Sequence, residues 1–197
     1  MYDFHHYDQP SWFLENFDQW DNWQEATNNP NVTILISEYQ CISIDTPDGV
    51  ATFSSPPSQK IDFPELFSAI AEGVYQIGAE RNPNVVRMMA LAPVLANFNN
   101  YASSPNTITY TANDTLASAS YWQQWLFGNY RGTQTLPVMN TVGNLNPLWW
   151  VALIDELSNA VYLKVQHSHR LSPICTSLTS ETGHQFGHKC CSLERGY

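Results

Sequence analysis

The clearest strand signal in this sequence is Asn31-Val-Thr-Ile-Leu-Ile-Ser-Glu-Tyr39. Five of the six residues from Val32 to Ser37 are β-branched or aliphatic, and the run is short. That composition is typical of a strand buried on both faces in a parallel sheet. We expect the strand to end at Glu38, and active-site groups of α/β barrels lie where strands end. Glu38 is therefore a candidate nucleophile or acid, and the alternative is a solvated carboxylate at a strand end.

The composition narrows the class of ligand. The chain has 197 residues, enough for one domain with a sizeable core or for two small ones. It holds 7 Trp, 10 Tyr and 9 Phe, and its formal net charge is −10. Sparse, acidic charge argues against nucleic-acid binding, because nothing would neutralise a run of phosphates. Many aromatics with few charges suit a neutral ligand such as a sugar, and equally suit an ordinary core.

Targeting and processing signals are few. No apolar run approaches the length of a membrane span, so we expect no membrane partner, and nothing predicts a cofactor. The first residues lack the basic and apolar regions of a signal peptide. Three of the four Cys lie in the last 23 residues and define no convincing disulfide framework. The sequons at Asn31 and Asn113 are glycosylation candidates that hint at secretion.

Hydrophobic spacing predicts alternating helices and strands in the first half of the chain. Helices are expected over about residues 10–26 and 63–81, and strands up to Glu38 and over Val85–Leu91. This alternation is the βα repeat of a parallel sheet. Residues 40–62 carry several turn signals and are expected to form a long loop.

After about residue 105 the pattern changes. A strand is expected at Thr107–Tyr110 and a helix at Ser118–Tyr130. Three short strands should follow: Thr133–Met139, Leu148–Asp155 and Ala160–Val165. Short strands separated by Asn, Gly and Pro turns are typical of an antiparallel β-sandwich. Trp149 and Trp150 are adjacent in one strand and point to opposite faces, so only one of them should be central in that core.

A series of motifs carries a family resemblance. Asp3-Phe-His5-His-Tyr7 is followed by a helix signal and then by the strand that reaches Glu38. Further motifs continue the order: Pro10-Ser-Trp-Phe-Leu-Glu-Asn16, Phe17-Asp-Gln-Trp-Asp21, Ala69-Ile-Ala-Glu-Gly73, Gly78-Ala-Glu-Arg-Asn82, Val85-Val-Arg-Met88, Ala92-Pro93, Ser120-Tyr-Trp122, Asn129-Tyr-Arg-Gly132 and Leu136-Pro137. In this order and spacing they resemble the C-terminal part of the family 51 α-L-arabinofuranosidases of fungi and plants, over about residues 1–165.

The resemblance implies a fold and a division of the chain. That family combines a (β/α)₈ TIM barrel with a jelly-roll-like β-sandwich, so the fold class would be α/β plus β. Residues 1–105 would form the last strands and helices of the barrel, and residues 106–166 the sandwich. Residues 167–197 depart from the family and lack periodicity, so we expect an unrelated, disordered tail.

The resemblance also implies an activity. Family enzymes are retaining glycosidases that release terminal arabinofuranose from polysaccharides such as arabinan and arabinoxylan, outside the cell. Retention needs two carboxyl groups about 5 Å apart, a nucleophile and an acid/base. The resemblance places the nucleophile at Glu38, and it makes His5 and Tyr7 the residues that contact the sugar and this carboxylate. A Tyr hydroxyl bonded to the nucleophile would hold it ionised.

The matching acid/base residue is not found in this chain. In the family it is a Glu after an Asn on an earlier strand, so we expect a truncated chain with negligible activity by itself. We interpret Glu80 and Arg81 as a structural pair, and Glu65 and Glu72 as solvated or helix-packing. If the chain proved active, Glu80 and Asp114 would be the next carboxylates to test.

Two other functions remain open alternatives. One is a non-catalytic carbohydrate-binding or interaction module, and the other is a different retaining barrel glycosidase. In the tail, ligand types for a metal occur at His184, His188, Cys190 and Cys191. Adjacent cysteines chelate one zinc poorly and a C-x₂-C element is absent, so no metal site is expected. The pattern indicates no particular oligomeric state.

Overall fold

The computed structural model describes residues 1–42, 64–99, 106–137 and 147–168. Three expectations therefore lie largely or wholly outside the described residues: most of the loop at 40–62, the candidate metal ligands of the tail, and the disorder of that tail beyond Ser168. His167, which the sequence assigned to the tail, is the last residue of a strand.

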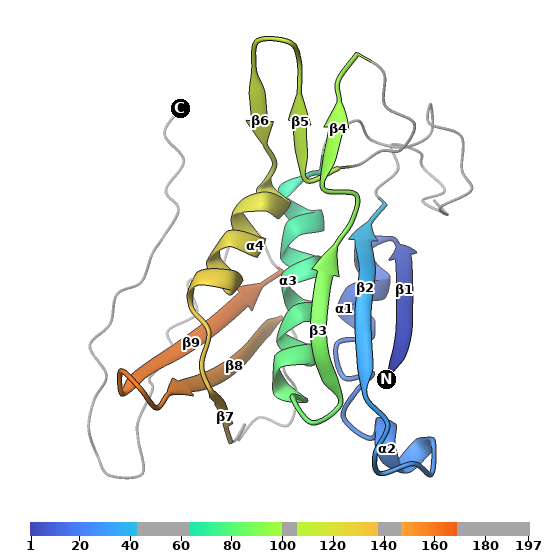
Figure 1. Cartoon of the computed structure of the whole chain (residues 1–197), viewed down its shortest axis with the longest axis vertical. Coiled ribbons are helices and arrows are strands. Elements are labelled where there is room, and N and C mark those ends of the chain that lie inside the picture. The colour runs from blue at the N-terminus through green and yellow to red at the C-terminus, as the bar shows by residue number, and fades with distance from the viewer. Residues whose placement is uncertain (43–63, 100–105, 138–146, 169–197) are drawn as a thin grey trace.

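Three parallel strands form the sheet that carries the candidate site. They are β1 (Tyr2–Asp8), β2 (Ile34–Cys41) and β3 (Val86–Leu91), in the spatial order β1-β2-β3. Their carboxyl ends all point towards the top of Figure 1. The predicted βα repeat of a parallel sheet is therefore present among the described residues.

Between Ile34 and Glu38, only one face of β2 is fully buried. Ile34, Ile36 and Tyr39 are at most 2% exposed and pack under the helices. Ser37 and Glu38 lie on the other face and keep part of their surface exposed. The prediction of a strand buried on both faces is wrong, because this second face meets polar side chains of β1 rather than an apolar layer.

The first helical segment is interrupted. α1 spans Pro10–Glu15 and α2 spans Trp23–Ala26, so the prediction of one continuous helix over residues 10–26 is wrong. The Asn16 side chain donates a hydrogen bond to the carbonyl of Trp12 and caps α1. The turn that follows places Trp20 in the core, fully buried, and this long-range burial outweighs the local helical spacing.

Helix α3 (Leu66–Arg81) lies between two cores. Ten of its 16 residues are buried. Ala71 and Tyr75 pack into the cluster with β2 and α1, while Val74 and Ile77 pack into a second cluster with strands further along the chain. A Cβ on Gly78 would lie 1.8 Å from the carbonyl oxygen of Phe17, so this close approach of helix and turn requires glycine.

The rest of the described chain forms two small sheets and one helix. Strands β4 (Leu95–Asn97), β5 (Ile108–Tyr110) and β6 (Thr115–Ala117) form one sheet, and α4 (Ala119–Asn129) follows it. Strands β7 (Gln134–Leu136), β8 (Leu148–Asp155) and β9 (Ala160–His167) form an antiparallel sheet that packs on α3 (Figure 1). Trp149 is 2% exposed and Trp150 is only partly buried, which confirms that one of the two is central.

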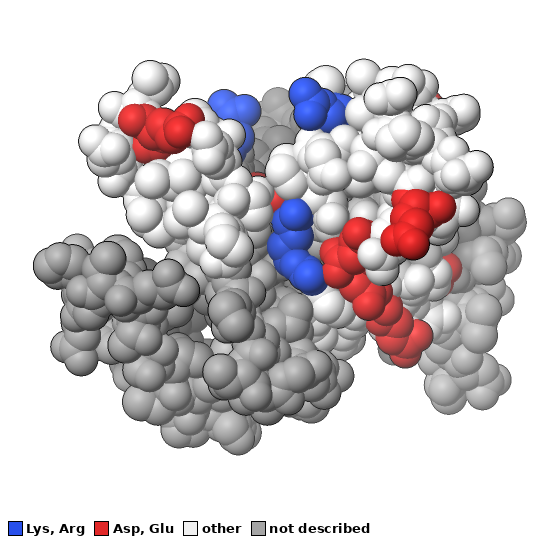
Figure 2. Space-filling model, turned by 90° about the horizontal axis from the view of Figure 1, so that it is seen from below, with Lys and Arg blue, Asp and Glu red and all other residues white. Residues whose placement is uncertain are grey.

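Charged side chains are sparse among the described residues on the face of the molecule seen from below. Figure 2 shows that face, where red acidic and blue basic side chains stand in a mostly uncharged surface. Among the described residues, no helix is both long enough and apolar enough to cross a membrane.

A buried ion pair joins α3 to the antiparallel sheet. Lys164 Nζ lies 2.6 Å from Glu80 Oε1, and the two side chains are 8% and 21% exposed. Lys164 also donates to the carbonyl of Phe127 at the end of α4. The interpretation of Glu80 and Arg81 as a pair is wrong: Arg81 pairs instead with Asp21, at 2.9 Å. Burial raises the pKa of Glu80 and lowers that of Lys164, and their mutual attraction opposes both shifts.

Removing one partner of the buried pair should destabilise the fold strongly. Lys164→Met leaves the Glu80 carboxylate buried without its cation, and we expect the free energy of unfolding to fall by about 3 kcal/mol at neutral pH. Arg81→Met breaks the more exposed pair with Asp21 and should cost about 1 kcal/mol or less. Urea denaturation measures both values. Equal losses in the two variants would contradict a special role for the Glu80–Lys164 pair.

Candidate active site

An extra residue in β2 turns Glu38 towards the open face. Along β1 the register pairs Phe4 with Ile36 and then His5 with Glu38, so Ser37 is the additional residue of a β-bulge. Strict alternation from Ile36 would have placed the Glu38 side chain under the helices. The bulge instead leaves both Ser37 and Glu38 on the face opposite the core.

Tyr7 reaches Glu38 from the neighbouring strand. Its hydroxyl donates a hydrogen bond of 2.7 Å to Glu38 Oε2. Burial, and then the hydrogen bond to Glu38, raise the pKa of the Tyr7 hydroxyl well above its usual range. Tyr7 therefore remains a donor at any physiological pH, and its hydrogen bond orients the Glu38 carboxylate.

His5 lies on the same face and contacts the same carboxylate oxygen. Its Nδ1 is 3.4 Å from Glu38 Oε2, and the two side chains are 47% and 43% exposed. The structure thus brings together the three residues that the sequence singled out. Their exposure leaves them accessible to a ligand from the solvent.

Two further residues extend the cluster on the other side of His5. Ser37 Oγ donates to Asp3 Oδ1 at 2.5 Å and lies 2.7 Å from His5 Nε2. Asp3 Oδ2 is 3.1 Å from the same ring nitrogen. The hydrogen bond from Ser37 is the main cause that lowers the pKa of Asp3 below its usual value. His5 is therefore held between two carboxyl groups.

His6 belongs to the core side of the sheet. Its ring stacks on Trp12 with centroids 3.5 Å apart, and Nε2 is 3.3 Å from Asp8 Oδ2. Burial lowers the pKa of His6, which favours the neutral ring. Successive strand residues point to opposite faces, so the paired histidines of the motif have separate environments.

A hollow of about 280 Å³ lies elsewhere, near the amino ends of β1 and β2. Its lining includes Tyr2, Trp23 and Ile34, and does not include His5 or Glu38. The candidate site shares Asp3 with this hollow, but its other residues do not line it. It is an open polar surface nearer the carboxyl ends of the same strands.

A buried carboxylate supports the end of β2 from below. Glu72 of α3 is fully buried, and its Oε1 accepts a hydrogen bond of 3.0 Å from the backbone N–H of Cys41. Burial raises the pKa of Glu72 to about 7, although the Ser120 hydroxyl and the Cys41 N–H act in the opposite direction. Glu65 is exposed, as expected for a solvated side chain.

With this geometry established, comparison with known proteins supplies the family. The profile of the alpha-L-arabinofuranosidase C-terminal domain matches residues 20–147, which is more than half of the chain. The chain belongs to this family. It corresponds to the C-terminal part of a family 51 arabinofuranosidase, as the order of its motifs predicted. Its sheet-rich architecture with few helices fits such a C-terminal domain.

Similar proteins of known sequence support the same family assignment. Alpha-L-arabinofuranosidase A of Aspergillus niger is 31% identical over 165 residues, covering 83% of this chain and 22% of that protein. The probable alpha-L-arabinofuranosidase A of Aspergillus oryzae (strain RIB 40) is 28% identical over 184 residues, covering 92% of this chain and 25% of that protein. This chain therefore spans about a quarter of the length of these two relatives, or slightly less.

Solved structures show the same similarity. The arabinose-bound MgGH51 α-L-arabinofuranosidase matches with a TM-score of 0.73 and 29% identity, covering 85% of this chain and 25% of that one. The α-L-arabinofuranosidase of Thermotoga maritima, in its arabinose complex, matches with a TM-score of 0.56 and 12% identity, covering 83% and 37%. The second match shows a shared fold alone.

Three members of the site were not identified from the sequence. Asp3 lies two residues before His5, so alternation places it on the same face, but the sequence did not indicate which residue it would contact. Ser37 reads as an ordinary strand residue, because nothing local announces the bulge. Glu72 sits in a helix whose burial on two sides depends on strands far away in the chain.

The burial of Glu72 predicts a specific pH dependence of stability. Between its ordinary pKa of 4.5 and its folded pKa of about 7, the native state binds more protons than the unfolded state. The free energy of unfolding should therefore fall as pH rises through this window, by about 3 kcal/mol at most. Glu72→Gln should remove that fall.

Urea denaturation at pH values across this range measures the effect. Glu65→Gln, on the exposed end of the same helix, is the matched control and should keep the slope of the parent chain. A Glu72→Gln variant with an unchanged slope would show that Glu72 is not protonated on folding.

Proposed function

We propose that this chain is the part of a retaining α-L-arabinofuranosidase that carries the nucleophile, Glu38. In this proposal Tyr7 orients and stabilises the ionised carboxylate, and His5 contacts the sugar. The substrate would be the terminal, non-reducing arabinofuranosyl groups of arabinan or arabinoxylan. The hydrogen bond from Tyr7 to Glu38 is the observation that carries this assignment.

The chemistry of a nucleophile supports these roles. A carboxylate that attacks an anomeric carbon must be ionised, exposed to the substrate and held in one orientation. Glu38 receives a hydrogen bond from a hydroxyl that stays protonated, and 43% of its side chain is exposed. Its partners come from an adjacent strand of the same sheet, which restricts movement of the carboxylate.

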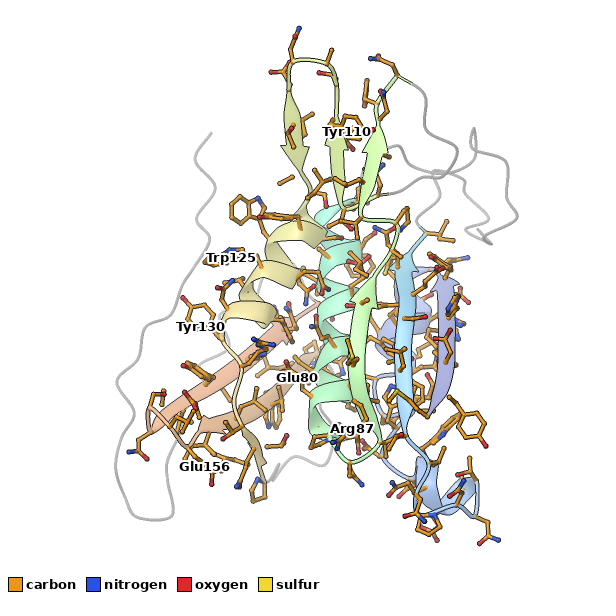
Figure 3. All side chains as sticks on the ribbon, in the orientation of Figure 1. Glu80, Arg87, Tyr110, Trp125, Tyr130 and Glu156 are labelled. Atoms are coloured by element: carbon orange, nitrogen blue, oxygen red, sulfur yellow. The ribbon has the colours of Figure 1, made fainter. Side chains whose placement is uncertain are left out.

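We assign the general acid to no described carboxylate. Glu80 is held by Lys164 near the end of α3 that lies away from the strand tips, as Figure 3 shows. Glu72 is buried beneath β2 and bound to Cys41. Asp114 lies in the turn between β5 and β6, where its N–H bonds to Thr111. The proposal therefore places the general acid in another part of a full-length enzyme.

The domain assignment belongs to the same proposal. The sheet of β1, β2 and β3 with its helices would be the last part of a (β/α)₈ barrel, within residues 1–105, and residues 106–166 would belong to the sandwich. The enzyme would act outside the cell on a polysaccharide. Asn31 and Asn113 are both exposed and would accept glycans there.

The nucleophile assignment can be tested by covalent labelling. We expect a mechanism-based arabinofuranosyl inhibitor with an activated leaving group to label this chain slowly at Glu38, because such a leaving group needs little protonation. Peptide mass spectrometry locates the label. Glu38→Gln should abolish it, and Glu15→Gln, which removes an exposed carboxylate of α1, should not.

Labelling of another carboxylate would contradict the assignment of Glu38. Binding of an arabino-oligosaccharide without any labelling would instead favour a non-catalytic carbohydrate-binding module.

Turnover of natural arabinan by this chain should be negligible. General acid catalysis contributes about 10²- to 10⁴-fold, and natural leaving groups depend on it. Arabinose release from arabinan should therefore be barely above background, while release of nitrophenol from nitrophenyl arabinofuranoside should be detectable. A chain with Glu38→Gln provides the background for both assays. Efficient turnover of arabinan would contradict this expectation, and Glu80 and Asp114 would then be the next carboxylates to test.

A further inference from the structure

The hydrogen bonds on the far side of His5 determine where its protons lie. Three groups meet there, the Asp3 carboxylate, Ser37 Oγ and His5 Nε2, at separations of 2.5 to 3.1 Å. A hydroxyl carries one hydrogen, and an ionised carboxylate only accepts. Ser37 gives its hydrogen to Asp3, so its oxygen faces His5 as an acceptor.

His5 Nε2 must then be the donor. It faces two acceptors, Ser37 Oγ at 2.7 Å and Asp3 Oδ2 at 3.1 Å. The opposite assignment, with Ser37 donating to the ring, would leave Asp3 facing two lone pairs at short distance. The lowered pKa of Asp3 agrees with the first arrangement, because a carboxyl that accepts two hydrogen bonds favours its ionised form.

From this arrangement we infer that Asp3 and Ser37 are positioning residues, which hold His5 with its hydrogen on Nε2 and its Nδ1 turned to Glu38. This inference rests on the proposed function, because His5 matters here as a fixed neighbour of the nucleophile Glu38. Nδ1 lies 3.4 Å from Glu38 Oε2.

The bulge in β2 gives this arrangement its geometry. The extra residue is Ser37 itself, and it places the hydroxyl next to Asp3 and His5 while Glu38 follows on the same face. This one backbone irregularity thus positions both the nucleophile, Glu38, and the Ser37 hydroxyl that orients His5. A strand without the bulge would present only one of the two side chains.

The positions of the protons can be measured by NMR. In the full chain labelled with ¹⁵N-histidine, and with His5 assigned through His5→Gln, Nε2 of the ring should be fully protonated at about pH 9, where a free histidine is neutral and shares its hydrogen between the two nitrogens. Ser37→Ala and Asp3→Ala should shift both nitrogens towards the averaged values of a free imidazole. Ser37→Thr keeps the hydroxyl and should restore the pattern.

The control is Asp18→Ala, which removes an exposed carboxylate of the turn after α1 and should leave His5 unchanged. Asp3 is 58% exposed, so its replacement should not unfold the chain. The rate of labelling at Glu38 should fall about ten- to a hundredfold in Asp3→Ala and Ser37→Ala, because a misplaced group next to the nucleophile slows the reaction by about that factor.

The outcomes separate the two proposals. Nitrogen shifts that are the same in the parent chain and both alanine variants would overturn the positioning role. A labelling rate that is unchanged in those variants would overturn it as well, while leaving Glu38 as the nucleophile. The expected shifts in a parent chain that is never labelled would support the positioning role and refute the proposed function.

Discussion

The bulge at Ser37 and Glu38 is the constraint on which the site depends. Without it, alternation along β2 would turn the Glu38 side chain towards Ile34 and Ile36, under the helices. A charged group without a partner at that place would oppose folding. With the bulge, the apolar positions before and after it, including Tyr39, still face the core. The strand therefore serves stability on one face and polar chemistry on the other.

Helix α3 connects that strand to the rest of the fold. One side of the helix packs on the parallel sheet and the other on the antiparallel sheet. Glu72 holds the end of β2, and Glu80 reaches Lys164 of β9. The two carboxylates differ in their partners. Burial raises the pKa of Glu72 to about 7, and no cation among the described residues pairs with it, whereas Glu80 pairs with the Lys164 amine. Helix position and strand position are thus coupled through polar contacts as well as apolar ones.

The sequence predicted features whose causes are local. Apolar spacing was enough for α3 and for β8, whose observed bounds, Leu148–Asp155, match the expected strand. His5, Tyr7 and Glu38 were found because motif order and the geometry of parallel strands place them near one another. The interrupted helix over 10–26 and the partner of Glu80 were missed, because Trp20 and Lys164 act through contacts distant in sequence. The bulge was missed because a single serine in an apolar strand carries no local signal.

A crystal structure of this chain with bound arabinose would test the central claim most directly. The account predicts that the sugar lies on the open face of β2, with its anomeric carbon about 3–3.5 Å from a Glu38 carboxylate oxygen and Tyr7 still bonded to that group. It also predicts Ser37 as an extra residue opposite β1. A sugar bound away from Glu38, or a Glu38 side chain turned under the helices, would contradict it.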